Sequence, residues 1–507
     1  MLYCPLLESE GLKEMRVKQF CRCLVLLVLT STASWPKRSA RHTPVNSGTS
    51  AAEKRTAAYF DSVRNQPSLL MDFLQRMPKG ADLHNHLSGA IYAESFIQWA
   101  AQDGLCVDIS TSTFLACDRA SDKPLASSAL TNPDLYTQLL EAFSMRGWFP
   151  ARESGHDHFF ATFGKFGAAT NGHTADMLVE VRERAARENL QYLELMFNPD
   201  NGQAASLGKR IGWNSDLAQM REALLAGGLQ QIVAQAGRSL DQIEAQEKEK
   251  MQCGQPQADA GCNVQARYLY QVARGLPKEM VFAQILAGFE MASKDPRVVG
   301  LNLVMAEDWY VPVHDFKLHM QMLDYLHRVY PKVHITLHAG ELTPLLVSPE
   351  DLFHIRWSID VGHAQRIGHG IDVMQEQNPI ALLKEMAAKK ILVEICLTSN
   401  DVILGVSGAR HPLPMYLKFD VPVALATDDA GVSRSSITQE YERAVETYQL
   451  SYPEVKKMVR ASLEYSFLPP GEKSAEEKQL EASLTRFEGG FAGPTKAEKG
   501  SPRRKQP

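Results

Sequence analysis

The sequence has little cysteine, no marked excess of either charge, and no hydrophobic run long enough to span a membrane. Eight cysteines among 507 residues are too few for a disulfide-built scaffold. With 54 Lys and Arg against 59 Asp and Glu, the chain lacks the basic excess of proteins that bind nucleic acids or acidic membranes. The 33 glycines and 26 prolines form no repeat, which excludes collagen and low-complexity scaffolds. We therefore expect a folded protein with a small-molecule ligand.

The N-terminal segment has the order of a secretory signal peptide. Arg16 and Lys18 precede an apolar run at Cys23–Leu29, and small residues follow it. This run is far shorter than the roughly 20 residues that span a bilayer, which argues against a membrane helix. We expect residues 1–34 to be removed and the product to be exported to the periplasm or the extracellular space.

Five cysteines lie beyond this leader. Cys106 and Cys117 form one pair that is close in sequence, and Cys253 and Cys262 form another, each in a segment typical of loops. Two local disulfides would suit an exported protein, and four unpaired thiols are the alternative. Cys396 lies within an apolar run and is predicted to be a buried strand residue.

Short apolar and β-branched runs alternate with helical stretches from about residue 80 to 430, which indicates a parallel sheet covered by helices. Eight such runs are the number that closes an α/β barrel of the (β/α)8, or TIM, type. A barrel of this type carries its catalytic residues at the C-terminal ends of the strands. The predicted strands are 81–86, 190–197, 264–271, 298–304, 333–338, 365–369, 391–396 and 421–427.

The predicted strands are unevenly spaced. About 100 residues separate the first two and about 65 the next two, where about 30 suffice for one βα unit. The excess predicts two insertions, at about 103–150 and 200–262, and the second contains a helical pattern that runs from 215 to about 250. The predicted order is a signal peptide (1–34), a helical extension (35–76) divided near Pro67, the barrel (77–470), and a C-terminal helix with a disordered tail (471–507).

Polar side chains stand where several predicted strands end. The first strand ends in His84 and His86, which project to the same face because side chains alternate along a strand. Such a pair offers two imidazoles to one metal ion, although a structural origin is equally compatible with the pair alone. Three further strand ends favour the metal, because a barrel brings all of its strand ends to one site. The residues at those ends are His338, Glu341, His369, Asp428 and Asp429.

Four of these residues form a donor set suited to one Zn²⁺ ion. Three imidazole nitrogens and one carboxylate oxygen leave a coordination position for water. The set is His84, His86, His338 and Asp428. The other three residues are then the polar groups nearest to that water.

Five motifs, LHNHLSGA, LHAGE, RIGHG, LTSN and ATDDAG, in this order resemble the adenosine deaminase family of metal-dependent (β/α)8 hydrolases. The resemblance covers about residues 75–470. The leader, the paired cysteines and the insertions are more similar to the secreted growth-factor branch, or to exported bacterial members, than to the short cytosolic enzymes. The resemblance implies one Zn²⁺ per chain and hydrolytic deamination of adenosine or 2′-deoxyadenosine, in which hydroxide held by the metal adds to C6 of the purine.

The resemblance also implies a role for each of the other polar residues. His369 would orient the water and take its proton, and Glu341 would protonate N1 of the ring. Asp429 would hydrogen-bond the N7 side of the purine or the incoming hydroxyl. Inosine and ammonia would be the products.

Two positions depart from the family pattern. Ser88, followed by Gly89, stands where the short members have an Asp that contacts the ribose, and a serine still donates or accepts one hydrogen bond. Met305 stands where a glycine is expected, so its side chain is predicted to change the pocket wall while its backbone N–H stays available to N3 of the purine. Glu307 and Asp308 are predicted to lie at the rim of this pocket.

Two other polar motifs are assigned supporting roles. His156 and His158 form a further His-x-His pair, but the aromatic residues that follow predict a helix with a packed apolar face. Ser399 and Asn400, after the seventh predicted strand, are predicted to support the site through hydrogen bonds. His411 is predicted to be a structural or rim residue.

The sequence leaves three functions open: an adenosine deaminase, the same chemistry on another adenine compound (AMP, adenine or an N6-substituted adenosine), and a secreted binding or growth-factor-like protein with little catalysis. A phosphate would call for a basic cluster near the strand ends, and only Lys79 and Arg366 lie close to a motif. The complete donor set argues against the third function. We expect a nucleoside ligand, no nucleic-acid partner, and no membrane partner after leader removal. The insertions leave room for a homodimer contact.

Overall fold

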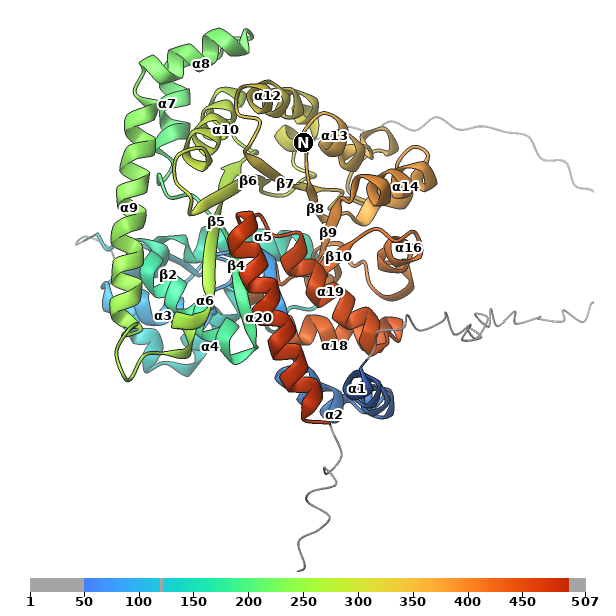
Figure 1. Cartoon of the computed structure of the whole chain (residues 1–507). Coiled ribbons are helices and arrows are strands. Elements are labelled where there is room, and N and C mark those ends of the chain that lie inside the picture. Colours follow the sequence, from blue (N-terminus) through green and yellow to red (C-terminus); the bar gives the residue numbers. More distant parts are fainter. Residues whose placement is uncertain (1–49, 119–121, 492–507) are drawn as a thin grey trace, which may run out of the picture. The chain divides into compact units, whose positions relative to one another are not determined.

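The computed structural model describes residues 50–118 and 122–491, and its core is an eight-stranded parallel sheet (Figure 1). The strands follow one another around the sheet in chain order. All eight predicted strands are confirmed, with ends shifted by at most two residues. They are β1 (Gly80–His86), β4 (Leu190–Phe197), β5 (Gln265–Ala273), β6 (Val298–Val304), β7 (His334–Ala339), β8 (Arg366–His369), β9 (Leu392–Ile395) and β10 (Val423–Leu425).

The first and last strands meet just beyond the end of β10, so the barrel is nearly closed. Asn85 and Asp428 form an isolated parallel bridge. The backbone N–H of Asp428 donates to the carbonyl of His84 (2.9 Å), and the N–H of His86 donates to the carbonyl of Asp428 (3.2 Å). The contacts that close the barrel are therefore made by residues that the sequence assigned to the site.

Helices cover the outer face of the sheet, which explains the apolar character of the strands. Every residue of β6 is buried, because a parallel strand in a barrel is covered on both faces. The helices that follow the strands are α6 (Thr174–Arg187), α10 (Lys278–Ala292), α11 (Tyr310–His314), α12 (Phe316–Val329), α13 (His354–Asp360), α14 (Pro379–Lys389), α15 (Leu397–Leu404), α16 (Leu413–Lys418), α17 (Ala430–Ser433), α18 (Ile437–Tyr448) and α19 (Tyr452–Glu464).

The helical sequence that precedes the barrel forms α1 (Ala51–Val63) and α2 (Pro67–Arg76). Proline at the first position of α2 divides them, because it lacks the N–H that a continuing helix would need. Phe73 of α2 packs edge-on against Phe487 of α20 (Pro470–Gly489), with ring centres 5.0 Å apart. The predicted signal peptide and the residues beyond 491 lie outside the described residues. None of the described helices is both long enough and apolar enough to cross a membrane.

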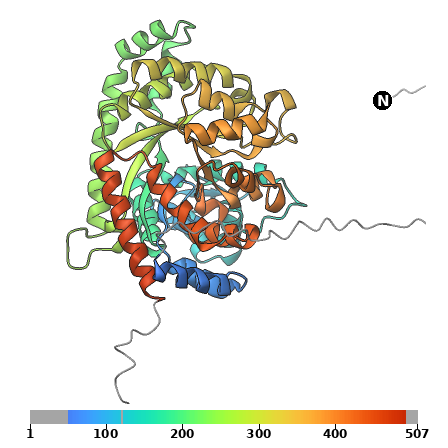
Figure 2. The ribbon, with the colours of Figure 1, turned by 45° about the vertical axis from the view of Figure 1, so that its right-hand side comes forward.

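The excess length lies between β1 and β5. The first part contains α3 (Ala93–Gln102), the antiparallel pair β2 (Cys106–Asp108) and β3 (Thr113–Leu115), α4 (Pro133–Ala142) and α5 (Gly155–Phe166). The second contains α7 (Gln203–Ile211), α8 (Leu217–Ala226) and α9 (Leu229–Lys250), and α9 runs along the barrel against α6 and α10 (Figure 2). The single helical run expected over 215–250 is wrong. Gly228 breaks it, since its φ of 109° lies outside the helical region.

Both sequence-close cysteine pairs form disulfides, Cys106–Cys117 and Cys253–Cys262. The second pair joins the end of α9 to the segment that leads into β5. Cys396 is the free thiol among the described residues. It is buried, as predicted, but it follows the last residue of β9 instead of lying within the strand.

Candidate metal centre

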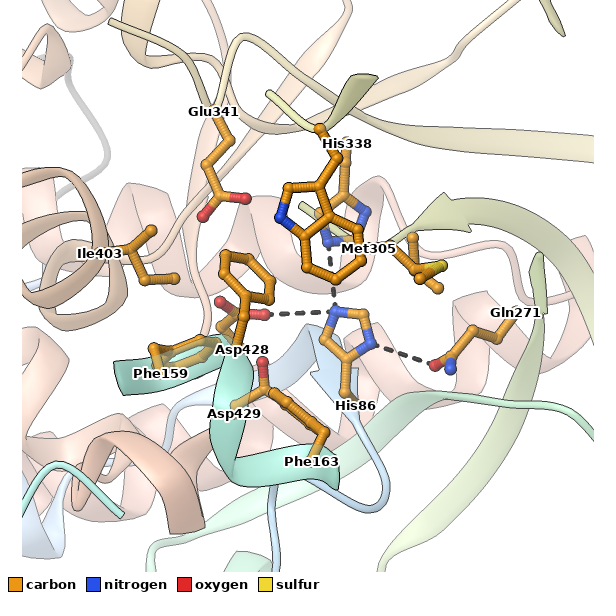
Figure 3. Close-up of a pocket in the computed structure, with 13 residues that line it drawn as sticks. His86, Phe159, Phe163, Gln271, Met305, His338, Glu341, Ile403, Asp428 and Asp429 are labelled. Atoms are coloured by element: carbon orange, nitrogen blue, oxygen red, sulfur yellow. Dashed lines mark hydrogen bonds and ion pairs between the residues drawn. The ribbon is translucent and has the colours of Figure 1, made fainter. Parts of the chain in front are cut away.

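Four donor atoms of the predicted set meet at the C-terminal end of the barrel. Figure 3 shows three of the residues, His86, His338 and Asp428. Nε2 of His338 lies 3.0 Å from Nε2 of His84 and 3.2 Å from Nε2 of His86. Oδ1 of Asp428 lies 3.4 Å and 3.3 Å from the same two nitrogens. Ligands about 2.0–2.1 Å from a tetrahedral Zn²⁺ stand about 3.3 Å apart. These four spacings are those of donors that share one tetrahedral ion. Donor atoms that all lie within 4.8 Å of one another form two clusters that share Asp428: one also contains His84, His338 and His369, and the other also contains His86 and Asp429.

The other polar atom of each donor residue is held by a hydrogen bond. An oxygen acceptor beside Nδ1 keeps the proton on that nitrogen and leaves the lone pair of Nε2 for a metal. The partners are Glu394 for His84 (2.7 Å), Gln271 for His86 (3.2 Å), Asn302 for His338 (3.0 Å) and Ser399, which donates to Oδ2 of Asp428 (2.6 Å). Oδ1 of Asp428 is buried and has no hydrogen-bond partner in the described chain, so a cation would satisfy it. The residues fit a zinc ion.

Several site residues adopt backbone conformations that cost energy. His369 and Asp428 have φ values of 66° and 58°, and Met305 has a φ of 87°. Such left-handed conformations cost non-glycine residues about 1–3 kcal/mol each and persist where the surrounding fold imposes them. Met305 thus keeps the backbone conformation that a glycine would adopt most easily.

Glu341, His369 and Asp429 surround the donor cluster. Each has one buried polar atom without a hydrogen-bond partner in the described chain: Oε1 of Glu341, Nε2 of His369 and Oδ1 of Asp429. Burial raises the pKa of Glu341 well above its usual range, and the charges of Asp428 and Glu307 add to the shift. Burial and the charge of Asp428 raise the pKa of Asp429 in the same way. These groups are available to a ligand.

Glu307 is not at the rim, where the sequence placed it. It is buried, and its carboxylate accepts the backbone N–H groups of Gly340 (3.1 Å) and Glu341 (2.8 Å). His354 donates to the same carboxylate (2.5 Å). Glu307 therefore fixes the backbone that presents the Glu341 side chain. Asp308 lies nearer the surface and accepts from Nε2 of His156 on α5 (2.9 Å).

A cavity of about 230 Å³ opens onto the donor atoms. Three phenylalanines of α5, together with Trp309 and Ile403, form its apolar wall, and Met305 lies beside them. The sequence predicted a packed face for α5 and missed its part in this wall, because nothing local showed that the insertion folds over the strand ends. Among the described residues, no Lys or Arg lines the cavity. The phenylalanines are Phe159, Phe160 and Phe163.

The structure separates the two residues that the sequence assigned to the sugar. Ser88 lines a second cavity beside the first. Gly89 lies under Asp429, where an added Cβ would stand 1.5 Å from Oδ1. The carbonyl of Gly89 accepts the N–H groups of Gly431 (2.9 Å) and Val432 (3.0 Å), which fixes the segment that follows Asp429.

Gly89→Ala is expected to displace the Asp429 carboxylate and to lower kcat by about 10²-fold or more, because an error of about 1 Å in a reacting group has effects of that size. Gly164→Ala on α5 is the control, since an added Cβ there meets nothing within 4 Å. The measurements are the initial rate of the expected adenosine deamination and the zinc content of both variants. Unchanged rates in Gly89→Ala would contradict the placement of Asp429.

A chain of hydrogen bonds fixes the proton of His369. The backbone N–H of Leu413 donates to Nδ1 of His411 (3.1 Å), so a neutral His411 carries its proton on Nε2. Nε2 of His411 lies 3.2 Å from Oδ1 of Asn400, and Nδ2 of Asn400 lies 3.0 Å from Nδ1 of His369. Burial lowers the pKa of His411 to about 3, which keeps it neutral. His369 therefore accepts at Nδ1 and carries its proton on the unpartnered Nε2.

The supporting roles predicted for Ser399 and Asn400 agree with these hydrogen bonds. The sequence did not connect His411 with the site, because 42 residues separate it from His369 and only the fold brings Asn400 between them. His156 and His158 lie within hydrogen-bond distance of the carboxylates of Asp308 and Glu153.

Comparison with known proteins agrees with this geometry. Residues 138–482 match the sequence model of the family described as adenosine deaminase. An adenosine deaminase of Shewanella woodyi is 25% identical over 397 residues, which cover 78% of this chain and 95% of that protein.

Two solved structures share the fold. The adenine deaminase of Arthrobacter aurescens has a TM-score of 0.52 at 18% identity and matches 80% of this chain and 99% of its own. The N6-methyl-AMP deaminase of Arabidopsis thaliana has a TM-score of 0.52 at 21% identity and matches 82% and 99%. With more than half of its length matched by the family model, this chain belongs to the adenosine deaminase family.

Proposed function

We propose that this protein hydrolyses adenosine and 2′-deoxyadenosine to the corresponding inosines and ammonia, with one Zn²⁺ held by the four donors. The observation that carries the proposal is the cluster of four donors, three of which line a cavity of about 230 Å³ together with Glu341, whose Oε1 has no hydrogen-bond partner in the described chain. When bound, zinc lowers the pKa of a water molecule toward about 7 and supplies a nucleophile at neutral pH.

Glu341 acts as the general acid. Its raised pKa keeps the carboxyl protonated near neutral pH, so that Oε1 can deliver a proton to N1 as the oxygen nucleophile adds to C6. This proton neutralises the charge that the addition would place on the ring. The proton of the C6 hydroxyl then passes to the amino group, which leaves as ammonia while the C6 carbonyl of inosine forms. The proton released when water ionised to hydroxide restores the carboxyl of Glu341.

His369 orients the nucleophile and does not take its proton. This role differs from the one that the family resemblance implies, and the hydrogen bonds through Asn400 and His411 support it because they favour a proton on Nε2 of His369. Nε2–H then donates a hydrogen bond to the attacking oxygen. Asp429 has its donor oxygen within 4.8 Å of the donor atoms of His86 and Asp428, and its raised pKa keeps the carboxyl protonated near neutral pH, so that it donates a hydrogen bond to N7 of the purine.

The cavity favours an uncharged substrate over a nucleotide. A phosphate buried without a cation would lose its hydration without compensation, and no Lys or Arg of the described chain lines the cavity. The two basic residues that the sequence placed near motifs lie at the opposite ends of their strands. Lys79 precedes β1 and donates to the carbonyls of Met77 and Glu188, and Arg366 begins β8 and pairs with Glu194.

Asn400→Asp is expected to reverse the tautomer of His369, because a carboxylate accepts from Nδ1–H and leaves Nε2 without a proton. We expect kcat to fall by about 10²–10³-fold, the usual effect of losing one preorganised donor, while the zinc content stays unchanged. Nitrogen-15 NMR of the histidines tests the assignment directly, since the protonated nitrogen of His369 should change from Nε2 to Nδ1. An unprotonated Nε2 in the wild type would contradict this role.

The test of the function is turnover by the purified, zinc-loaded protein. We expect loss of adenosine absorbance with release of equal amounts of inosine and ammonia, a similar rate for 2′-deoxyadenosine, and a much slower rate for AMP. Adenine and an N6-methyl nucleoside complete the substrate set. A preference for AMP would show that the substrate is a nucleotide and not a nucleoside. A protein that turns over none of these compounds would overturn the proposal.

A further inference from the structure

A second, wider cavity lies beside the metal centre. Its volume is about 690 Å³, against about 230 Å³ for the cavity at the donor atoms. It is formed at the C-terminal ends of β1, β4 and β5, between the start of α6 and the middle of α9. The first cavity is smaller than the range of about 300–1,000 Å³ that is usual for ligand pockets, and the second lies within this range.

Gln271 at the end of β5 lines both cavities. Its Oε1 accepts from His86, as described above, and its amide nitrogen has no hydrogen-bond partner in the described chain. Ser88 follows the metal donors of β1 by two residues and lines the second cavity only. Gln271 and Ser88 therefore place the second cavity next to a purine held at the donors.

The wall of this cavity is polar and uncharged. Amide and hydroxyl side chains dominate it, and within residues 50–118 and 122–491 no Asp, Glu, Lys, Arg or His lines it. Such a wall is unusual in a chain whose residues are 22% charged. Amides and hydroxyls both donate and accept, which matches the hydroxyl groups of a neutral sugar. The polar residues include Ser88, Asn171, Asn198, Asn201, Gln242 and Gln246.

We propose that this cavity is a subsite for an uncharged, hydroxyl-bearing group attached to the ribose, such as a second sugar. The proposal rests on the proposed function, since it extends the substrate from adenosine to glycosylated adenosines. A charged group in this cavity would find no opposite charge in the wall, and the neutral amides would replace its lost hydration only in part. Gln271 would donate its free amide N–H to the sugar at the junction between the two cavities.

The experiment compares adenosine with 2′-O- and 5′-O-β-D-ribofuranosyladenosine. We expect at least one disaccharide nucleoside to be deaminated with a kcat/KM within about tenfold of that for adenosine, because the subsite accommodates the added sugar without desolvating a charge. AMP, which carries a charged group at the 5′ position, should have a kcat/KM far below that of adenosine and of the accepted disaccharide. Rejection of both disaccharides by an enzyme that deaminates adenosine would overturn the proposal.

Gln242→Trp on α9 fills the cavity at an exposed position that lies outside the catalytic machinery. It should lower kcat/KM for the disaccharide by about tenfold or more and leave that for adenosine unchanged. Gln231→Trp, exposed on the same helix and outside the cavity, is the matched control. Equal losses for both substrates would overturn the subsite.

Failure of the proposed function has a different signature. If the wild type deaminates neither adenosine nor the disaccharides, the proposed function fails. Calorimetric titration of the same compounds then decides the subsite. Tighter binding of the disaccharide to the wild type than to Gln242→Trp would support it, and equal binding to both would overturn it.

Discussion

Glu341→Gln is expected to lower kcat on adenosine by about 10²–10⁴-fold, the usual contribution of a positioned general acid. The amide has the shape of the carboxyl but cannot deliver a proton to N1. The hydrogen bonds to Glu307 come from the backbone of Gly340 and Glu341 and survive the change. Initial rates at saturating adenosine measure the loss, and the zinc content is expected to stay the same.

The stability of this variant provides a second readout. Burial raises the pKa of Glu341 well above its usual range. An acid with a raised folded-state pKa destabilises the fold as pH rises from its unfolded-state value, because the unfolded chain then ionises more readily. A neutral amide lacks this penalty, so the metal-free variant should unfold at the same temperature as the wild type or a higher one near neutral pH. Glu350→Gln, exposed in the same loop, is the control, and equal kcat in Glu341→Gln and wild type would sink the assignment.

His338→Ala is expected to abolish zinc binding and to reduce deamination by more than about 10³-fold, since a metal ion contributes several kcal/mol of transition-state stabilisation. His338 occupies the centre of the donor set, and its Nε2 contacts both His84 and His86. Without His338, the donor set is reduced to two imidazole nitrogens and the carboxylate oxygen of Asp428. Zinc analysis after dialysis and the rate on adenosine give the two measurements.

His334→Ala is the matched control on the same strand. His334 begins β7 at the other end of the barrel, where its ring stacks on Phe467 with centres 4.7 Å apart. This variant should keep its zinc and its rate, although its stability should fall slightly. A chelator should lower the melting temperature of the wild type and of His334→Ala but not that of His338→Ala, because a bound ligand stabilises only the fold that binds it. Zinc retained by His338→Ala would refute the donor set.

The strands could be predicted because a parallel barrel leaves its signature in local sequence. Each strand is buried on both faces and appears as a short apolar run, and the metal donors stand at the ends of such runs. The ends of the runs β1, β7 and β10 therefore identified His84, His86, His338 and Asp428 without any knowledge of their distances.

The supporting residues could not be predicted in this way. Glu394 lies inside the apolar run of β9, and its charge within a buried strand was a signal for a partner, but the run does not reveal His84 as that partner. His411 lies in a connection between helices and carries no signal of its own. Side-chain direction also requires the fold, as Ser88 illustrates by facing the second cavity.

The break between α8 and α9 was visible in the sequence as two adjacent glycines, Gly227 and Gly228. The prediction of one continuous helix rested on the helical pattern that the sequence shows on both sides of these glycines. Gly228 has a φ of 109°, which ends one helix and begins another. The turn matters for the site because it sets the direction of α9, which forms one wall of the second cavity.

Titration of the metal-free protein with Zn²⁺, with adenosine deamination followed at each addition, is the most direct test of the metal centre and its chemistry. Four donors in one cluster predict that the rate rises in proportion to added zinc and becomes constant at one ion per chain. A rate that does not depend on zinc, or no deamination at any zinc concentration, would contradict the proposed function.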